Sequence, residues 1–334
     1  MQQVLTAYVT RTQIPRILRA AYFGDRTRCP QCGFTRKLWP LSDDRWQCPR
    51  CYKKFTLGTD TWLARATLSW TAIYELLHWF ELGLSDRTIL ERLELDYQQG
   101  RRVFHRLREA IVVHENQSIR VLDGEVKVDE TYGGYKCRNR KRAQREPLRK
   151  TGQVQRGRGA KHLQQPVFGI YERADGIVYV KPVDDVTKET PQQIIKGKVT
   201  LDTTIYCDTW KAYHQLDQTF EAHQRVNHSQ HEYVRGAVSI DGIEGFWGCL
   251  KGRLLKYHGI RPRTFMRYLK VAEFRLNHRH LTPEEFVQSL VTVLMEPVTP
   301  RNDKCPTLIY QPNQNRETTR YRYVCVKQWQ GTRY

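Results

Sequence analysis

The chain of 334 residues has no long apolar run and comparatively few acidic residues. No stretch approaches the roughly 20 apolar residues that a membrane-spanning helix needs, so we expect no membrane segment. The first residues, Met-Gln-Gln-Val-Leu-Thr-Ala-Tyr, lack the charged-then-apolar order of a secretory signal. Both absences argue against a membrane or secreted protein and favour the cytoplasm.

The shortage of acidic residues makes the chain strongly basic. Asp and Glu number 35 against 55 Lys and Arg, which gives a formal charge of +20 and a pI near 9.7. Such an excess supplies a salt-sensitive affinity for phosphate backbones. We therefore favour a nucleic-acid-binding protein, located at the nucleoid if it is bacterial, over a merely basic soluble one. The hydrophobic content of 40% permits cores in two or three modest domains.

Nine cysteines without an export signal favour reduced thiols or metal ligands over disulfides. Four of them form two Cys-x-x-Cys pairs with 15 residues between the pairs: Cys29 and Cys32, then Cys48 and Cys51. Four thiolates complete a closed, tetrahedral Zn²⁺ site of the structural kind. We predict a zinc ribbon over residues 1–60, with Trp46 and Phe55 packing its strands. The pattern leaves open whether the ribbon contacts DNA or protein.

Residues 61–118 carry helical patterns. Ser85 can cap a helix over 86–93, and a further helix is predicted over 97–113. A helix, a short turn and a helix suit a helix-turn-helix DNA reader, and the alternative is a small helical bundle that links two domains. The candidate DNA contacts on the last helix are Arg101, Arg102 and Arg106.

Residues 119–290 alternate between short apolar runs and helical patterns, which indicates an α/β domain. Strands are predicted at 125–128, 166–171, 177–183 and 204–207, and helices at 190–196, 243–257 and 262–277. The Asp-Gly pair at 175–176 indicates a hairpin. Residues 136–164 are rich in Lys, Arg, Gln and Gly and predict a mobile basic loop that either orders on DNA or stays solvated. We assign no role to the tail, 291–334.

Three acidic residues stand at the edges of these elements. Asp129 and Asp208 each end a β-type run, where an acid is well placed to face a cleft, and Glu244 opens a helical pattern. Carboxylates at the ends of two strands and at the start of a helix can bind two Mg²⁺ ions, which contact the attacking and leaving oxygens of a phosphodiester. Any one of them can instead be a surface carboxylate. Glu130 is a rival of Asp129, and Asp241 can cap the helix or serve as a fourth acid.

The helix predicted to begin near Glu244 also carries a candidate phosphate ligand. Lys251 follows Glu244 by seven residues, which places both on one helical face, and Gly248 between them leaves room for a ligand backbone.

Several motifs follow one another in a characteristic order. They are the Cys-x-x-Cys ribbon, the helix-turn-helix pattern, Val-Asp-Glu-x-Tyr-Gly-Gly, Pro-Val-Phe-Gly-Ile, Asp-x-Trp-x-x-Tyr and Gly-Ile-Glu-Gly-Phe-Trp-x-x-x-Lys. From about residue 28 to 290 the chain resembles the insertion-sequence DDE transposases with an N-terminal zinc ribbon. This bacterial family is related to the eukaryotic Merlin elements.

The resemblance implies an RNase H-like catalytic domain with a mixed sheet. Asp129, Asp208 and Glu244 would bind two Mg²⁺ or Mn²⁺ ions, and Lys251 would contact DNA. Such an enzyme binds the terminal inverted repeats of an element, cleaves the donor strand with metal-activated water and joins the released 3′-OH to target DNA. Because two ends must be held together, the resemblance implies a homodimer or higher multimer on DNA.

The chain departs from the family pattern at two positions. Asp241 stands where the family tends to have Asn, and Ser239 where it usually has His. The added negative charge either supports catalysis or marks a decayed copy.

Three other functions compete with this reading. One is a zinc-ribbon DNA-binding regulator without catalysis, and another is a nuclease that cuts without joining. A tyrosine recombinase ranks last, because no Arg and His constellation surrounds any one Tyr.

Overall fold

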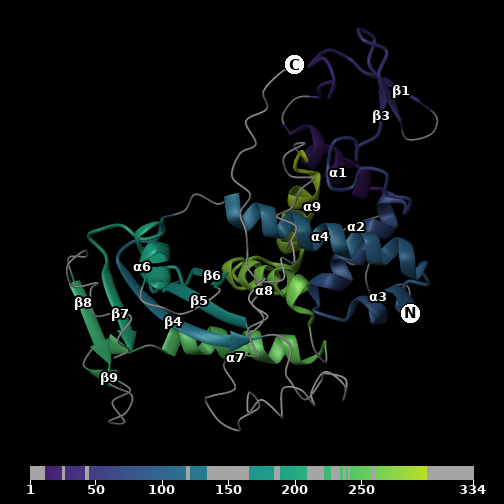
Figure 1. Cartoon of the computed structure of the whole chain (residues 1–334). Coiled ribbons are helices and arrows are strands. Elements are labelled where there is room, and N and C mark those ends of the chain that lie inside the picture. Colours follow the sequence, from purple (N-terminus) through teal and green to yellow (C-terminus); the bar gives the residue numbers. More distant parts are fainter. Residues whose placement is uncertain are drawn as a thin grey trace, which may run out of the picture. The chain divides into compact units, whose positions relative to one another are not determined.

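The computed structural model in Figure 1 describes residues 12–24, 27–41, 45–117, 121–133, 165–183, 189–208, 222–226, 234–235, 238–239, 241–257 and 260–298. These residues fall into two compact units. The helical unit draws on Met1–Gln117 and His278–Cys305, and the sheet unit on Ser118–Asn277. Across the described ranges, no helix is long and apolar enough to cross a membrane.

The helical unit contains the predicted ribbon. Strands β1 (Trp39–Pro40), β2 (Trp46–Gln47) and β3 (Lys54–Phe55) form an antiparallel sheet. Pro40, Trp46 and Phe55 make one cross-strand row, and Trp39, Gln47 and Lys54 make the other. Alternation along the strands puts these rows on opposite faces.

Helix α1 (Ile14–Phe23) supplies the packing for one of these faces. The ring of Phe23 lies edge-on to Trp46 and Phe55, with centroids 6.2 and 6.5 Å away. The predicted packing role of both aromatic residues is confirmed, and their partner is a helix that precedes the ribbon.

Helices α2 (Trp70–Glu81), α3 (Asp86–Arg92) and α4 (Tyr97–Gln117) follow. The predicted cap is present, since the Ser85 hydroxyl accepts a hydrogen bond from the Thr88 N–H at 3.2 Å. Asp96 does the same for the Gln99 N–H at 2.8 Å and starts α4. The short turn between α3 and α4 includes Glu94 at φ 52°. Helix α4 runs four residues beyond its predicted end.

Helix α9 (Pro283–Met295) returns the chain to the helical unit. It packs against α1, α2 and α4, and Thr282 with Glu285 forms a capping box at its start. The predicted catalytic domain extended to residue 290, whereas the sheet unit ends at Asn277. An amphipathic pattern shows that a helix has an apolar face but does not show which domain covers it.

The sheet unit contains a five-stranded sheet in the order β6-β5-β4-β7-β8. The strands are β4 (Glu125–Gly133), β5 (Gln165–Glu172), β6 (Val178–Pro182), β7 (Thr204–Asp208) and β8 (Ala222–Val226). Neighbours among β4, β5 and β6 are antiparallel, and β7 and β8 run parallel to β4. The predicted strands and the hairpin at Gly176 are present, but β4 runs five residues beyond its predicted end, because the polar residues 129–133 still pair with β5. Asp129, which was predicted to end a strand, therefore lies in the middle of one. Strand β8 and the small pair β9 (Val234–Arg235) and β10 (Val238–Ser239) are not among the predictions.

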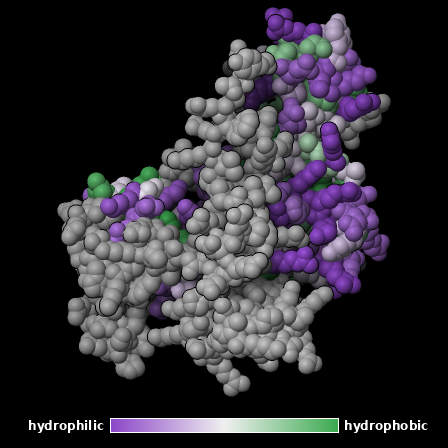
Figure 2. Space-filling view, viewed as in Figure 1, coloured by the Kyte–Doolittle hydropathy of each residue, from purple (hydrophilic) through white to green (hydrophobic). Residues whose placement is uncertain are grey.

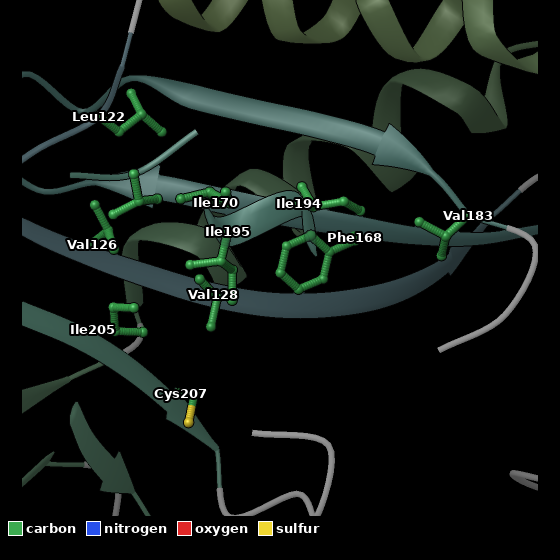
Figure 3. Packing of buried hydrophobic residues seen from close by; sticks show 11 residues of the cluster. Leu122, Val126, Val128, Phe168, Ile170, Val183, Ile194, Ile195, Ile205 and Cys207 are labelled. Atoms are coloured by element: carbon green, nitrogen blue, oxygen red, sulfur yellow. The ribbon is translucent and has the colours of Figure 1, made fainter. Parts of the chain in front are cut away.

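Each face of this sheet carries its own apolar core. Helix α6 (Glu189–Lys196) covers one face, where Val126 and Val128 pack with Ile195 (Figure 3). Helices α7 (Asp241–Leu255) and α8 (Pro262–Asn277) cover the other, where Trp247 and Phe265 pack on β5 and β6. Because side chains alternate along β4, Lys127 and Asp129 belong to the α7 side.

Candidate functional site

The four ribbon cysteines converge on one point. Their sulfur atoms all lie within 4.8 Å of one another, and they are the only such cluster of three or more ligand groups among the described side chains. Cys29 Sγ lies 3.6 Å from Cys51 Sγ, and Cys32 Sγ lies 3.6 Å from Cys48 Sγ. A tetrahedral site with Zn–S bonds of about 2.3 Å separates its sulfurs by about 3.8 Å. The thiols therefore fit a structural Zn²⁺ ion.

The two cysteine pairs share one backbone geometry. The N–H of Gly33 donates to the Cys29 carbonyl, and the N–H of Tyr52 donates to the Cys48 carbonyl. Gly33 and Tyr52 both have positive φ, 69° and 58°. Burial acts to raise the pKa of the Cys48 thiol, but hydrogen bonds from the backbone N–H groups of Cys51 and Arg50 lower it, whereas the neighbouring thiols raise the pKa of Cys51. Zinc binds the thiolate form.

The ribbon carries exposed aromatic side chains and many basic residues. Trp39 is 46% exposed and Tyr52 is 64% exposed. Residues 27–59 contain two acidic residues, Asp43 and Asp44, against seven basic ones: Arg28, Arg36, Lys37, Arg45, Arg50, Lys53 and Lys54. Figure 2 shows hydrophilic residues gathered over the ribbon and over α3 and α4.

The predicted DNA-contacting arginines divide into two kinds. Arg101 and Arg102 are exposed on the first turns of α4. Arg106 instead donates from Nη1 to the Ala64 carbonyl, and burial lowers the pKa of its guanidinium. The Arg106 guanidinium therefore binds a backbone carbonyl within the helical unit, unlike the exposed Arg101 and Arg102. The helical pattern gave no sign of this partner 42 residues earlier in the chain.

Asp129 is half-buried on β4 and faces α7. The indole N–H of Trp247 donates to Asp129 Oδ2 over 2.9 Å. Its rival Glu130 occupies the alternate position on β4, paired with Phe168, which is on the α6 side. Asp129 and Glu130, which are neighbours in the sequence, therefore lie on opposite faces of the sheet.

Asp208 is the last residue of β7, the strand next to β4. Glu125, Val126 and Lys127 pair in parallel with residues 204–206, so continuing the register by two residues brings position 208 level with Asp129. The backbone of Asp208 is described, and its side chain lies outside the described part of the chain.

Helix α7 presents Glu244 and Lys251 on its exposed surface. At 100° per residue, Glu244 and Lys251 lie about 60° and about 40° around the helix axis from Trp247, so the two differ by only about 20°. Because Trp247 reaches Asp129, both residues belong to the half of the helix that adjoins Asp129. A Cβ at Gly248 would meet no atom within 4 Å, so the space beside them is open. The side chain of Asp241 lies outside the described residues, and both roles predicted for it stay predictions.

Sequence reasoning missed the polar role of Trp247. Helical spacing puts Trp247 beside the apolar stripe of its helix and predicts only a packing role, and the residue is indeed 4% exposed. An indole N–H that donates to a residue 118 positions away leaves no periodic signal in the sequence.

Comparisons with known proteins identify the family of the chain. A family model described as the ISXO2-like transposase domain matches residues 121–277. The chain is 38% identical over 104 residues to an uncharacterized transposase-like protein of Haemophilus influenzae, covering 31% of the chain and 84% of that protein. It is also 26% identical over 281 residues to an uncharacterized protein in transposable element ISH50 of Halobacterium salinarum, covering 81% of the chain and 92% of the relative. The family predicted from the motifs is confirmed: the chain belongs to the ISXO2-like transposases of insertion sequences.

Proposed function

We propose that this protein is a metal-dependent DNA transposase that binds element ends, cleaves the donor strand and transfers its 3′ end to target DNA. One observation carries the proposal. The register of the adjacent parallel strands β4 and β7, continued by two residues, brings Asp208 level with Asp129, and the helix that bears Glu244 packs over Asp129. Acids on adjacent strands, under a helix with an exposed lysine, suit phosphodiester chemistry.

The catalytic domain in this proposal is RNase H-like. Numbered within the sheet unit, the strand order is 3-2-1-4-5, with the second strand antiparallel to its neighbours and the first, fourth and fifth parallel. This is the arrangement expected of that fold. It puts the first and fourth strands side by side, with Asp129 in the middle of the first and Asp208 at the end of the fourth.

Three carboxylates would hold the catalytic ions. Asp129, Asp208 and Glu244 supply hard oxygen ligands, which Mg²⁺ and Mn²⁺ prefer. Bound ions would lower the pKa of water and neutralise charge on the phosphate. The protein's own part is to place these ligands on rigid elements, and Lys251 would hold a phosphate of the DNA.

DNA recognition in this proposal uses the helical unit. Arg101 and Arg102 project from the start of α4, after the short turn that follows α3, as in a helix-turn-helix reader. The ribbon face that carries Trp39 and Lys54 offers stacking and charge to a backbone. The basic segment 136–164 lies outside the described residues, and its role stays a prediction. A dimer or higher multimer would hold two element ends together.

A cleavage assay on DNA carrying the element's terminal repeat tests this function. Asp208→Asn should abolish Mg²⁺-dependent cleavage while leaving end binding intact, because it removes a metal ligand and little else. If Asp208→Asn still cuts, the catalytic assignment is wrong, and if the wild type binds but never cuts, the DNA-binding regulator is the better account. A pre-cleaved 3′-OH end separates a transposase, which joins it to target DNA, from a nuclease, which does not.

A further inference from the structure

We infer that Trp247 is a positioning residue of the acidic site: its indole N–H fixes the Asp129 carboxylate, and Gly169 makes the room that lets the ring lie there. The inference rests on the proposed function, since it concerns the same acids. It adds two residues, 78 positions apart in the sequence, that act through Asp129.

The hydrogen bond itself is well defined. Trp247 Nε1 lies 2.9 Å from Asp129 Oδ2, and the indole is almost wholly buried while the carboxylate is only half-buried. An indole N–H can only donate, so the contact requires an oxygen with a lone pair on Asp129. Hydrogen bonds to an ionised acceptor are stronger than those between neutral groups, so this bond favours the charged carboxylate.

Gly169 explains why the ring can reach this position. It pairs with Asp129 across β4 and β5. A Cβ built on Gly169 would lie 2.6 and 2.7 Å from Trp247 Cζ2 and Cη2, closer than real Cβ contacts, and 3.3 Å from Ile243 Cδ1. Any side chain at position 169 would therefore push the indole away from the sheet and from Asp129.

The buried face of α7 keeps the ring in place on its other side. Ile243 is 0% exposed and Phe246 is 3% exposed, and the ring of Phe246 lies 5.0 Å from that of Trp247. The donor is thus held by packing, and the bond restricts rotation of the Asp129 carboxylate. Partners that hold a ligand in this way fix its orientation before the ion binds.

The test replaces the donor without removing the aromatic ring. Trp247→Phe in the full-length protein should bind Mn²⁺ about tenfold to a hundredfold more weakly than the wild type, measured by calorimetry without DNA. Cleavage should fall at limiting Mn²⁺ and recover in large part at saturating Mn²⁺. A merely structural role would lower activity at every Mn²⁺ concentration alike.

Two controls separate this effect from lost packing. Trp79→Phe removes a buried indole N–H of the helical unit that has no hydrogen-bond partner among the described residues, and it should leave Mn²⁺ affinity within about twofold. Leu269→Val trims the same core from α8 and leaves unchanged the residues that hold the ring, Ile243 and Phe246, so it should behave likewise. Thermal unfolding of each variant reports how much packing was lost.

A second variant disturbs the same hydrogen bond through a substitution on strand β5. Gly169→Ala keeps both Trp247 and Asp129 but displaces the ring, so it should reproduce the weaker Mn²⁺ binding.

NMR spectroscopy of the indole N–H groups reports on the contact directly. One of the eight indole N–H resonances of the wild type should be absent from the spectrum of Trp247→Phe. That resonance should shift in Asp129→Ala, and it should broaden when Mn²⁺ binds the wild type.

The outcomes distinguish the inference from the proposed function. If Asp208→Asn loses Mn²⁺ binding while Trp247→Phe and Gly169→Ala keep it, the positioning role is wrong and the transposase site stands. If the wild type binds no Mn²⁺ and Asp208→Asn cuts DNA as well as the wild type, the proposed site itself fails.

Discussion

At the scale of single residues, the buried pair of Arg108 and Asp86 is the strongest link between α3 and α4. Two guanidinium nitrogens of Arg108 donate to the two Asp86 oxygens at 2.6 and 2.8 Å, and the Arg108 side chain is 5% exposed. The guanidinium carbon also lies 5.7 Å from the ring centroids of Phe80 and Phe104. A bidentate pair of this kind sets the angle between two helices as well as holding them together.

Asp86→Ala should therefore destabilise the protein by about 3 kcal/mol, because it leaves the buried Arg108 charge without its partner. Urea denaturation followed by circular dichroism measures the change. Glu91→Ala is the matched control on the same helix, since its pair with Arg87 is exposed and should contribute nothing measurable. Equal effects of the two substitutions would contradict the role of the buried pair.

At the scale of secondary-structure elements, the docking of α9 depends partly on a histidine. His114 Nδ1 on α4 lies 2.7 Å from Glu296 Oε1 just after α9. This hydrogen bond to Glu296 raises the pKa of His114 above its ordinary value, and burial opposes the rise. A raised pKa in the folded state gives a stabilisation that is complete below the unfolded value, near 6.5, and is lost as the pH rises through the folded value.

The stability difference between the wild type and Glu296→Gln should therefore be largest below about pH 6.5 and should shrink at higher pH. Denaturation curves at pH 6 and pH 9 measure it. A difference that grew with pH would show that the pair does not stabilise α9 as a protonated histidine and a carboxylate.

We predict that the ribbon is an element whose folding depends on zinc. Cys32→Ser should lower zinc content and expose the ribbon to limited proteolysis, because a module of this size folds on its ion. Cys249→Ser changes an exposed thiol on α7 and should keep the zinc. Full zinc content in Cys32→Ser would show that the four cysteines do not form the site.

Elements were predicted well where the signal was local. The caps at Ser85, the strand periods and the two Cys-x-x-Cys pairs all depend on residues close in sequence, and the structure has them. Strand β8 was missed because its sequence, Ala-His-Gln-Arg-Val, is apolar only at its two ends and shows no alternation of apolar and polar residues. The partners of Arg106 and Trp247 lie 42 and 118 residues away, and only the fold brings them together.

At the scale of the whole molecule, the charge of +20 dominates encounters with DNA. Affinity for any duplex should fall steeply as salt rises, because each neutralised phosphate releases counterions. Arg101→Ala and Arg102→Ala should each reduce the slope of log K against log salt by about 1. Arg106→Ala should leave that slope unchanged, since its guanidinium binds the Ala64 carbonyl. A fluorescence titration between low and moderate salt provides the slopes, and equal losses for all three would place Arg106 on DNA.

The arrangement of the acids is most directly tested by a crystal structure with Mn²⁺ and element-end DNA. We predict anomalous peaks about 2.1–2.2 Å from carboxylate oxygens of Asp129, Asp208 and Glu244, with Lys251 on a DNA phosphate. Trp247 should still donate to Asp129 in that structure. Manganese bound elsewhere, with Asp129 and Asp208 pointing apart, would contradict the account.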